Sequence, residues 1–140
     1  MDTNPSTSTT NTTSDDRTSG VTDKTIVFLS RSIDDERSTV AWTLANAGVA
    51  NGQEVTVFAV SSGVDVLRKG AADTVQMNPH DPSMKELIGK FMASGGTVWA
   101  CPPCSALRGY TEDQFIDGVR ITGAGPVFEL IANGAATICL

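Results

Sequence analysis

The sequence predicts an α/β fold in which a mostly parallel sheet of five strands lies between helices on both faces. Two observations support this prediction. Short β-branched and aromatic runs alternate along the chain with segments of helical periodicity, and glycine and proline residues separate them. Such alternation folds as a three-layer α/β/α domain, because each crossover between parallel strands lays a helix on a face of the sheet.

Strands are expected where continuous apolar runs lie between turn-forming residues. Residues 25–30 form such a run, of the kind found in strands that are buried on both faces of a parallel sheet. On the same grounds, strands are expected at residues 25–30, 54–60, 97–100, 119–122 and 135–140.

Helices are expected between these strands. The first is expected to open at a capping box of Ser32 and Asp35 and to end at Gly48 or Gly52. Further helices are expected near residues 64–67, over 83–93, from Cys104 toward Gly109, from a capping box of Thr111 and Gln114, and over 126–133. The loop of residues 70–82 is long enough to act as a lid or a subunit contact.

Composition predicts one folded domain preceded by a polar tail. The chain has 140 residues, a usual length for one domain, and 40% of them are apolar. Residues 1–22 consist mainly of Ser, Thr, Asn and Asp, with almost no apolar surface to offset the entropy of ordering. We therefore expect residues 1–22 to be disordered and residues 23–140 to form a single α/β domain.

Charge and hydropathy argue against several classes of partner. The net charge is −6 and no Lys and Arg cluster is visible, so no nucleic-acid partner is expected. No apolar run approaches the roughly 20 residues of a membrane span, so no membrane partner is expected either. The polar start lacks the basic and apolar parts of a secretory signal, which makes the cytoplasm the expected compartment.

Two of the three cysteines, Cys101 and Cys104, come directly after the third expected strand. In a reducing compartment this spacing favours redox, sulfur or metal chemistry over structural disulfides. Parallel sheets place their sites at the carboxyl ends of strands, where Ser30, Ser61 and Thr122 are also expected. The pair is therefore expected at the functional edge of the sheet.

Cys101 is the expected nucleophile, because the start of a helix favours a thiolate over a thiol. Two prolines follow it and supply no amide hydrogens, so its nearest backbone donors are expected at Cys104 and Ser105. Cys104 is close enough to resolve a persulfide or a disulfide on Cys101. Arg108, one helical turn after Cys104, could stabilise a thiolate. The candidate catalytic residues are thus Cys101, Cys104 and Arg108.

Three alternatives remain open for the pair. The cysteines could be inert, half-buried thiols that act only as small apolar side chains. A closed zinc site needs about four ligands, and only His80 and Cys139 remain as further His or Cys residues. A thioredoxin-type site follows an early strand and faces a later cis-proline, a setting that this sequence lacks. No metal and no cofactor are therefore expected.

The chain resembles the DsrE/DsrF-like (DsrEFH) family over residues 24–140. The likeness lies in residues 44–58, 101–109 and 121–124. The resemblance implies compact α/β proteins that assemble into trimers or hexamers and pass sulfur as a cysteine persulfide, in relays for tRNA thiolation or sulfur oxidation. It implies that Cys101 accepts the sulfur and that Cys104 is a second thiol, which many relay subunits lack.

Two hypotheses follow. The first is a sulfur-carrier or thiol-exchange protein that uses a persulfide or disulfide at Cys101 and Cys104, with other proteins as donor and acceptor and no independent turnover. The second is a non-catalytic homo-oligomeric binding or scaffold module with inert cysteines. Thiol reactivity separates them, because rapid alkylation confined to Cys101 favours chemistry and slow labelling of all three thiols favours the module.

Overall fold

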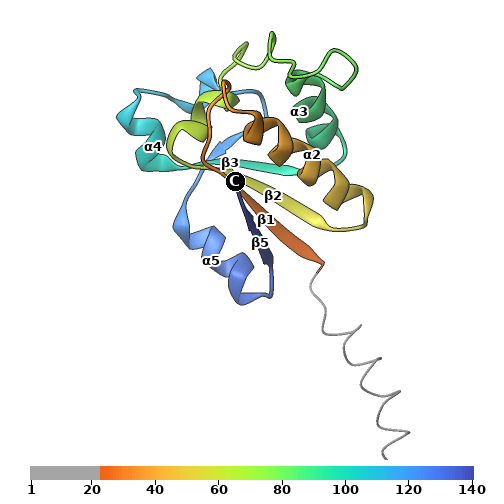
Figure 1. Ribbon diagram of the computed structural model, residues 1–140. Coiled ribbons are helices and arrows are strands. Elements are labelled where there is room, and N and C mark those ends of the chain that lie inside the picture. The colour runs from red at the N-terminus through yellow and green to blue at the C-terminus, as the bar shows by residue number, and fades with distance from the viewer. Residues whose placement is uncertain (1–22) are drawn as a thin grey trace, which may run out of the picture.

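Five parallel strands form the central sheet of the computed structural model, which describes residues 23–140 (Figure 1). In chain order they are β1 (Lys24–Leu29), β2 (Glu54–Ala59), β3 (Thr97–Ala100), β4 (Arg120–Ile121) and β5 (Ala136–Cys139). They lie in the order β4-β3-β2-β1-β5, and every neighbouring pair is parallel. The predicted α/β class is thereby confirmed. The tail predicted at residues 1–22 lies outside the described residues.

A helix is present in each segment for which the sequence predicts one. The α-helices are α2 (Glu36–Ala50), α3 (Met84–Ala93), α4 (Pro102–Leu107) and α5 (Ala124–Ala132), and the 3-10 helices are η1 (Ser61–Leu67) and η2 (Glu112–Gln114). In this described part of the chain, no helix has both the length and the apolar content needed to cross a membrane.

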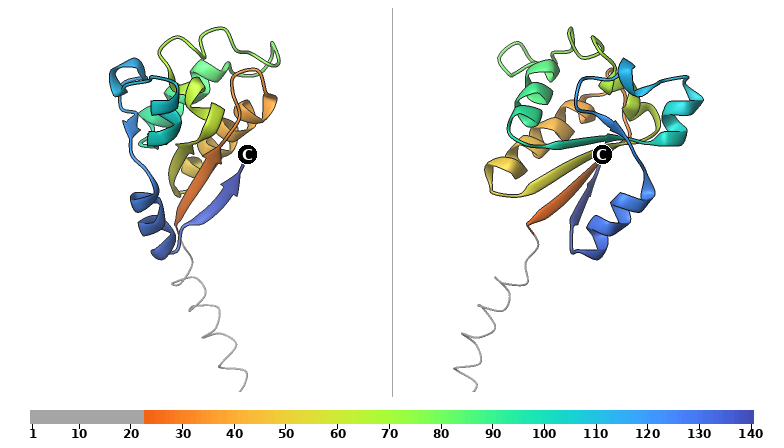
Figure 2. Two further views of the ribbon diagram at one scale, coloured as in Figure 1. Left: turned by 90° about the vertical axis from the view of Figure 1, so that its left-hand side faces the viewer. Right: turned by 180° about the vertical axis from the view of Figure 1, so that it is seen from behind.

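The strand order places helices on both faces of the sheet. From β1 to β4 the chain moves in one direction across the sheet, and it then returns to the far side of β1 to form β5. Because crossovers between parallel strands are right-handed, this reversal sends α5 to the face opposite α2 and α3. Figures 1 and 2 show α2 packed beside α3, with α5 away from both and next to β5.

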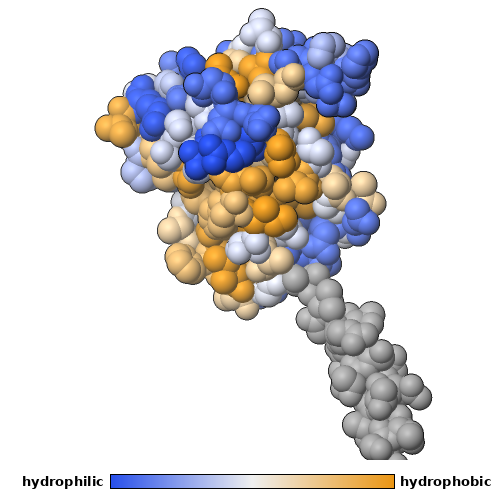
Figure 3. Space-filling view, viewed as in Figure 1, coloured by the Kyte–Doolittle hydropathy of each residue, from blue (hydrophilic) through white to orange (hydrophobic). Residues whose placement is uncertain are grey.

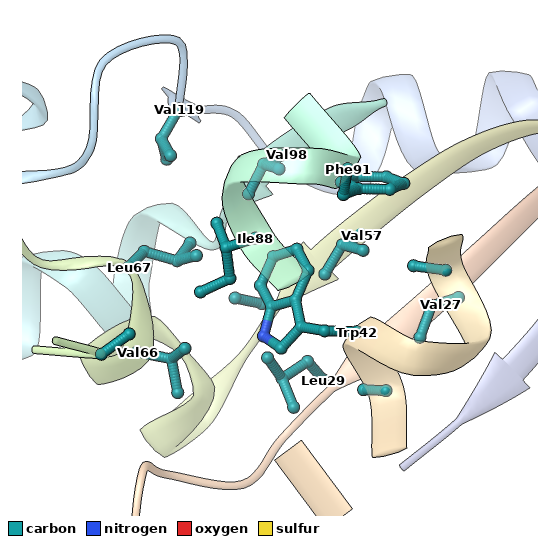
Figure 4. Packing of buried hydrophobic residues seen from close by; sticks show 14 of the residues in the cluster. Val27, Leu29, Trp42, Val57, Val66, Leu67, Ile88, Phe91, Val98 and Val119 are labelled. Carbon is teal, nitrogen blue, oxygen red and sulfur yellow. The ribbon is translucent and has the colours of Figure 1, made fainter. Parts of the chain in front are cut away.

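The face under α2 and α3 carries the main hydrophobic core. Trp42 of α2 and Phe91 of α3 are fully buried there, with their ring centroids 5.8 Å apart at an interplanar angle of 65°. Figure 4 shows the Trp42 ring among aliphatic side chains that come from the strands, η1 and α3. Edge-to-face packing of this kind adds to the stabilisation from burial. The core thus holds β2, β3 and η1 in fixed relative positions.

Among the described helices, only α5 covers the opposite face of the sheet. A smaller buried cluster joins Ile26, Phe58 and Val127 on this side. Phe128 and Ile131 of α5 stay 65% and 38% exposed. Figure 3 shows a broad apolar area over this part of the molecule. One copy of the chain therefore leaves much of its second apolar layer accessible to solvent.

The start of α2 differs from the predicted capping box. Asp35 is the N-cap, and its Oδ1 accepts the Arg37 amide at 2.9 Å. The Ser32 carbonyl accepts the Ser38 hydroxyl at 2.6 Å, so Ser32 belongs to the preceding turn. The prediction of a box opened by Ser32 is wrong, because the Asp35 carboxylate itself accepts the Arg37 amide in the first turn of the helix.

Candidate functional site

The cysteine pair lies at the carboxyl edge of the sheet, beside the ends of β2 and β3. The Cys101 amide donates to the Ala59 carbonyl at 2.9 Å, which extends the pairing of the two strands beyond Ala100. Ser61 follows the end of β2 on the neighbouring strand. The pair thus lies at the edge where parallel sheets carry their sites.

The first turn of α4 brings the two sulfurs together. Cys101 immediately precedes this helix and Cys104 lies within its first turn. The Ser105 amide and hydroxyl both donate to the Cys101 carbonyl, at 3.0 and 2.8 Å, and so hold the turn. Both cysteines are half-buried free thiols, and their Sγ atoms are 2.9 Å apart. At this distance one thiol donates a hydrogen bond to the other.

A backbone amide from another element also contacts the pair. The Ser61 N–H donates to the Sγ of Cys104 at 3.0 Å. Ser61 has a φ of 52°, and it is the one non-glycine residue with positive φ in the described chain. Backbone held in this region by its surroundings is common at functional sites. Sequence reasoning missed this contact, because a left-handed serine has no signature in the sequence.

Gly63 explains how Ser61 is held in place. A Cβ atom at Gly63 would lie 2.1 Å from the carbonyl oxygen of Leu29, so no larger residue fits. The Val60 amide donates to the same carbonyl at 2.9 Å, and the Gly63 amide donates to the Val60 carbonyl at 2.8 Å. The start of η1 is therefore pressed against the end of β1, and this contact aims the Ser61 amide at Cys104.

Burial raises the pKa of the Cys101 thiol, and the side chain of Cys104 raises it further through a hydrogen bond and its charge. The Cys104 backbone amide donates to the Cys101 sulfur and lowers this pKa, without offsetting the other effects. The helix N-terminus alone predicts the opposite direction. The helix has only 6 residues, and it begins with Pro102 and Pro103, which carry no amide hydrogens.

Arg108 lies beside the pair, but its described contacts are with oxygen atoms. Its Nη1 donates to the Cys104 carbonyl at 3.1 Å, and its Nε lies 3.5 Å from Oδ1 of Asp65. The Tyr110 hydroxyl donates to that same oxygen at 2.6 Å. These contacts hold the turn that carries Cys104. Sequence reasoning missed Asp65 and Tyr110, because 45 positions separate them and no local pattern links them.

Within residues 23–140, no three or more His, Cys, Asp or Glu side chains are grouped so that they could hold a metal ion. Of the residues weighed for a zinc site, His80 lies in the loop before α3 and Cys139 lies in β5. What the structure does bring together is a dithiol held by backbone amides and carbonyls.

The chain is similar in sequence to one protein family over the whole of its described part. The sequence profile of the DsrE/DsrF-like family matches residues 23–140. Uncharacterized protein MK0008 of Methanopyrus kandleri is 34% identical over 98 residues, which are 69% of this chain and 76% of that protein. Uncharacterized protein MJ0989 of Methanocaldococcus jannaschii is 29% identical over 98 residues, which are 69% of this chain and 81% of that protein.

Solved structures share the fold. The ychN protein from E. coli has a TM-score of 0.67 at 18% identity, with 82% of this chain and 98% of that chain covered. Protein MTH1491 from Methanobacterium thermoautotrophicum has a TM-score of 0.63 at 21% identity, with 84% and 98% covered. At such identities the likeness establishes the fold, and the chemistry has to be argued from the residues of this chain.

Proposed function

This chain belongs to the DsrE/DsrF-like family, and we propose that it is a sulfur-carrier or thiol-exchange protein that acts through Cys101 and Cys104. The proposal depends above all on the 2.9 Å between their Sγ atoms at the carboxyl edge of the sheet. Membership supports sulfur relay at the level of the family. The paired thiols supply the group that sulfur transfer needs.

Sulfur enters when a thiolate of the pair attacks the outer sulfur of a donor persulfide. A new S–S bond forms on the cysteine, the S–S bond of the donor breaks, and the donor leaves as a thiolate. The outer sulfur then passes to an acceptor thiolate by the same reaction. Alternatively, the second cysteine attacks the persulfidated one, which expels hydrosulfide and closes a Cys101–Cys104 disulfide.

In this proposal the sulfur donor and the sulfur acceptor are other proteins. The chain is then a carrier without independent turnover of a small molecule. We place the chemistry in the cytoplasm, because a reducing compartment keeps both cysteines available as thiols.

The apolar face over α5 favours homo-oligomerisation, and with it the second candidate function. Phe128 and Ile131 are 65% and 38% exposed on this face, and Phe28 and Trp99 are only partly buried beside them. Contiguous apolar surface of this kind marks interaction sites. We propose that further copies of the chain cover it in a trimer or hexamer. In the alternative of an oligomeric binding or scaffold module, the cysteines are inert and the cleft at the strand ends holds a small ligand or a partner.

Intact mass spectrometry of the reduced full chain, treated with inorganic polysulfide, tests the carrier function. The expected result is the gain of sulfur at the pair, or the loss of two hydrogens as Cys101 and Cys104 join. Peptide mapping then locates the change. The variant Cys139→Ser is the matched control and is expected to react like the native chain, because Cys139 lies apart on β5.

In the Cys139→Ser background, the double variant Cys101→Ser, Cys104→Ser is expected to take up no sulfur. If it reacts as readily as the native chain, the pair is not the carrier. If the native chain takes up no sulfur and all three thiols alkylate slowly, the binding module is the function.

A further inference from the structure

The two sulfurs of the pair have different surroundings. The Sγ of Cys104 accepts an amide hydrogen from η1, an element outside its own turn, at 3.0 Å. The sulfur of Cys101 has its amide contact within the turn, and burial outweighs that contact and raises its pKa. The two thiols are therefore unequal, although the sequence presents them as a simple pair.

The Ser61 amide is a preorganised donor. Its residue keeps a φ of 52°, and the close approach of Gly63 to the Leu29 carbonyl prevents the segment from relaxing away. Strained backbone persists only where the surrounding structure determines it. A donor fixed in this way stabilises negative charge on the atom that it faces. It already points at that atom, so no free energy is spent on reorienting it when the charge appears.

Two charged side chains beside the pair, Arg108 and Asp65, largely offset each other. Arg108 of the α4 end lies 3.5 Å from Asp65 of η1, and Asp65 also accepts the Tyr110 hydroxyl. Opposite charges paired at this distance cancel much of each other's effect on a third group. Among the described contacts, the Ser61 amide is therefore the hydrogen bond that reaches a sulfur of the pair from outside its own turn.

We infer that Cys104 is the attacking sulfur, that the Ser61 amide holds its thiolate, and that Cys101 is the resolving thiol. The inference rests on the proposed function, and it reverses the order of roles that the family resemblance implies. It predicts that the sulfur of Cys104 reacts first, and that the Ser61 amide is the backbone group responsible.

The steps balance with a donor persulfide as the only co-reactant. The Cys104 thiolate bonds to the outer sulfur of the donor, whose own S–S bond breaks, and the donor leaves as a thiolate. Cys101 then gives its proton to water and attacks the Sγ of Cys104, 2.9 Å away. The disulfide closes and the outer sulfur leaves as hydrosulfide, so two thiols are oxidised while one sulfur is reduced.

Single-thiol variants test which sulfur carries the charge. In a Cys139→Ser background, Cys101→Ser leaves Cys104 alone and Cys104→Ser leaves Cys101 alone. The rate of alkylation by iodoacetamide is measured against pH for both. We expect Cys104 to react roughly tenfold faster than Cys101 at neutral pH. Equal rates, or a faster Cys101, overturn the inference.

Substitutions at Ser61 test the amide itself. Ser61→Gly keeps the N–H and tolerates the positive φ, so the Cys104 profile is expected to stay in place. Ser61→Pro removes the N–H from Cys104, because proline has none and cannot adopt a φ of 52°, so alkylation of Cys104 is expected to slow while that of Cys101 is unchanged. A Cys104 profile that is indifferent to Ser61→Pro in a folded protein overturns the role of the amide. If Ser61→Pro does not fold, the single-thiol comparison still decides.

Inorganic polysulfide separates failure of the inference from failure of the proposed function. Brief treatment of the chain that keeps both cysteines, followed by peptide mapping, is expected to find the first sulfur on Cys104. A first sulfur on Cys101 overturns the order of roles and leaves the carrier function intact. If mapping finds neither added sulfur on either cysteine nor a disulfide between them, the carrier function is overturned, and the attacking role of Cys104 with it.

Discussion

Tyr110 donates its hydroxyl hydrogen to Oδ1 of Asp65 at 2.6 Å, across 45 positions of the chain. The Nε of Arg108 lies 3.5 Å from the same oxygen. Asp65 belongs to η1, and Arg108 is the residue that ends α4. One carboxylate thus ties the element that presents the Ser61 amide to the helix that carries Cys104.

This contact predicts an unusual titration for Tyr110, the single tyrosine of the chain. The hydrogen bond to Asp65, then burial and the Asp65 charge, raise the pKa of Tyr110 above 10.0. Ultraviolet titration of tyrosinate is expected to show Asp65→Asn lowering this pKa toward 10.0. Asp73→Asn is the control and is expected to leave it unchanged, because Asp73 pairs with Lys85 elsewhere.

The same shift links Tyr110 to stability at alkaline pH. Because the pKa of Tyr110 is raised in the folded chain, the protonated hydroxyl stabilises the fold. This stabilisation is complete below pH 10.0 and is lost as pH rises through the folded pKa. In urea unfolding, the difference between native and Tyr110→Phe chains should therefore shrink at strongly alkaline pH. A difference that stays constant with pH would contradict this coupling.

Asp35 predicts a pH dependence at the acid end. Hydrogen bonds from the Arg37 side chain and backbone hold the pKa of Asp35 at about 2, below its usual 3.8. The stabilisation is therefore present above pH 3.8 and is lost as pH falls through about 2. Urea unfolding should find Asp35→Asn less stable than the native chain near neutral pH, with the difference shrinking as pH falls through about 2. Asp34→Asn, at an exposed neighbour, is the control and should change little.

Gly63→Ala is expected to destabilise the fold. Its new methyl group would meet the Leu29 carbonyl oxygen at 2.1 Å, so η1 has to move. Forcing atoms into packed positions costs about 1–3 kcal/mol. The matched control is Gly89→Ala on α3, where no atom lies within 4 Å of the added Cβ. There we expect a gain of about 0.5–1 kcal/mol in the free energy of unfolding.

Both glycine variants can be measured by urea unfolding at one pH. A Gly63→Ala chain as stable as the native protein would show that η1 can move away from the Leu29 carbonyl at little cost in free energy. The Leu29 contact would then not be what aims the Ser61 amide at Cys104.

Phe128→Glu tests the apolar face over α5. Phe128 is 65% exposed on that face, and a buried, unpaired carboxylate is costly at an interface. Light scattering coupled to size-exclusion chromatography is expected to find an oligomer for the native chain and a smaller species for Phe128→Glu. Val40→Glu, at a 43% exposed position on α2, is the control and should keep the native size. A monomeric native chain would refute the proposed assembly.

Much of the fold is predictable from local patterns. The strand run at residues 25–30 and the apolar spacing of residues 83–93 correspond to β1 and α3, because side-chain periodicity reports directly which faces are buried. Where prediction failed, two local signals competed. At the start of α2, both Ser32 and Asp35 are good caps, and only the path of the chain after β1 selects Asp35.

For the candidate site, the sequence by itself determined the thiols and their place: Cys101 and Cys104 follow a strand of a parallel sheet, and that position depends only on local order. The tertiary structure alone decided how unequal these thiols are. The Ser61 amide reaches Cys104 across 43 positions, and burial raises the pKa of Cys101. Both effects depend on which distant segments meet at the sheet edge, and no local pattern records such meetings.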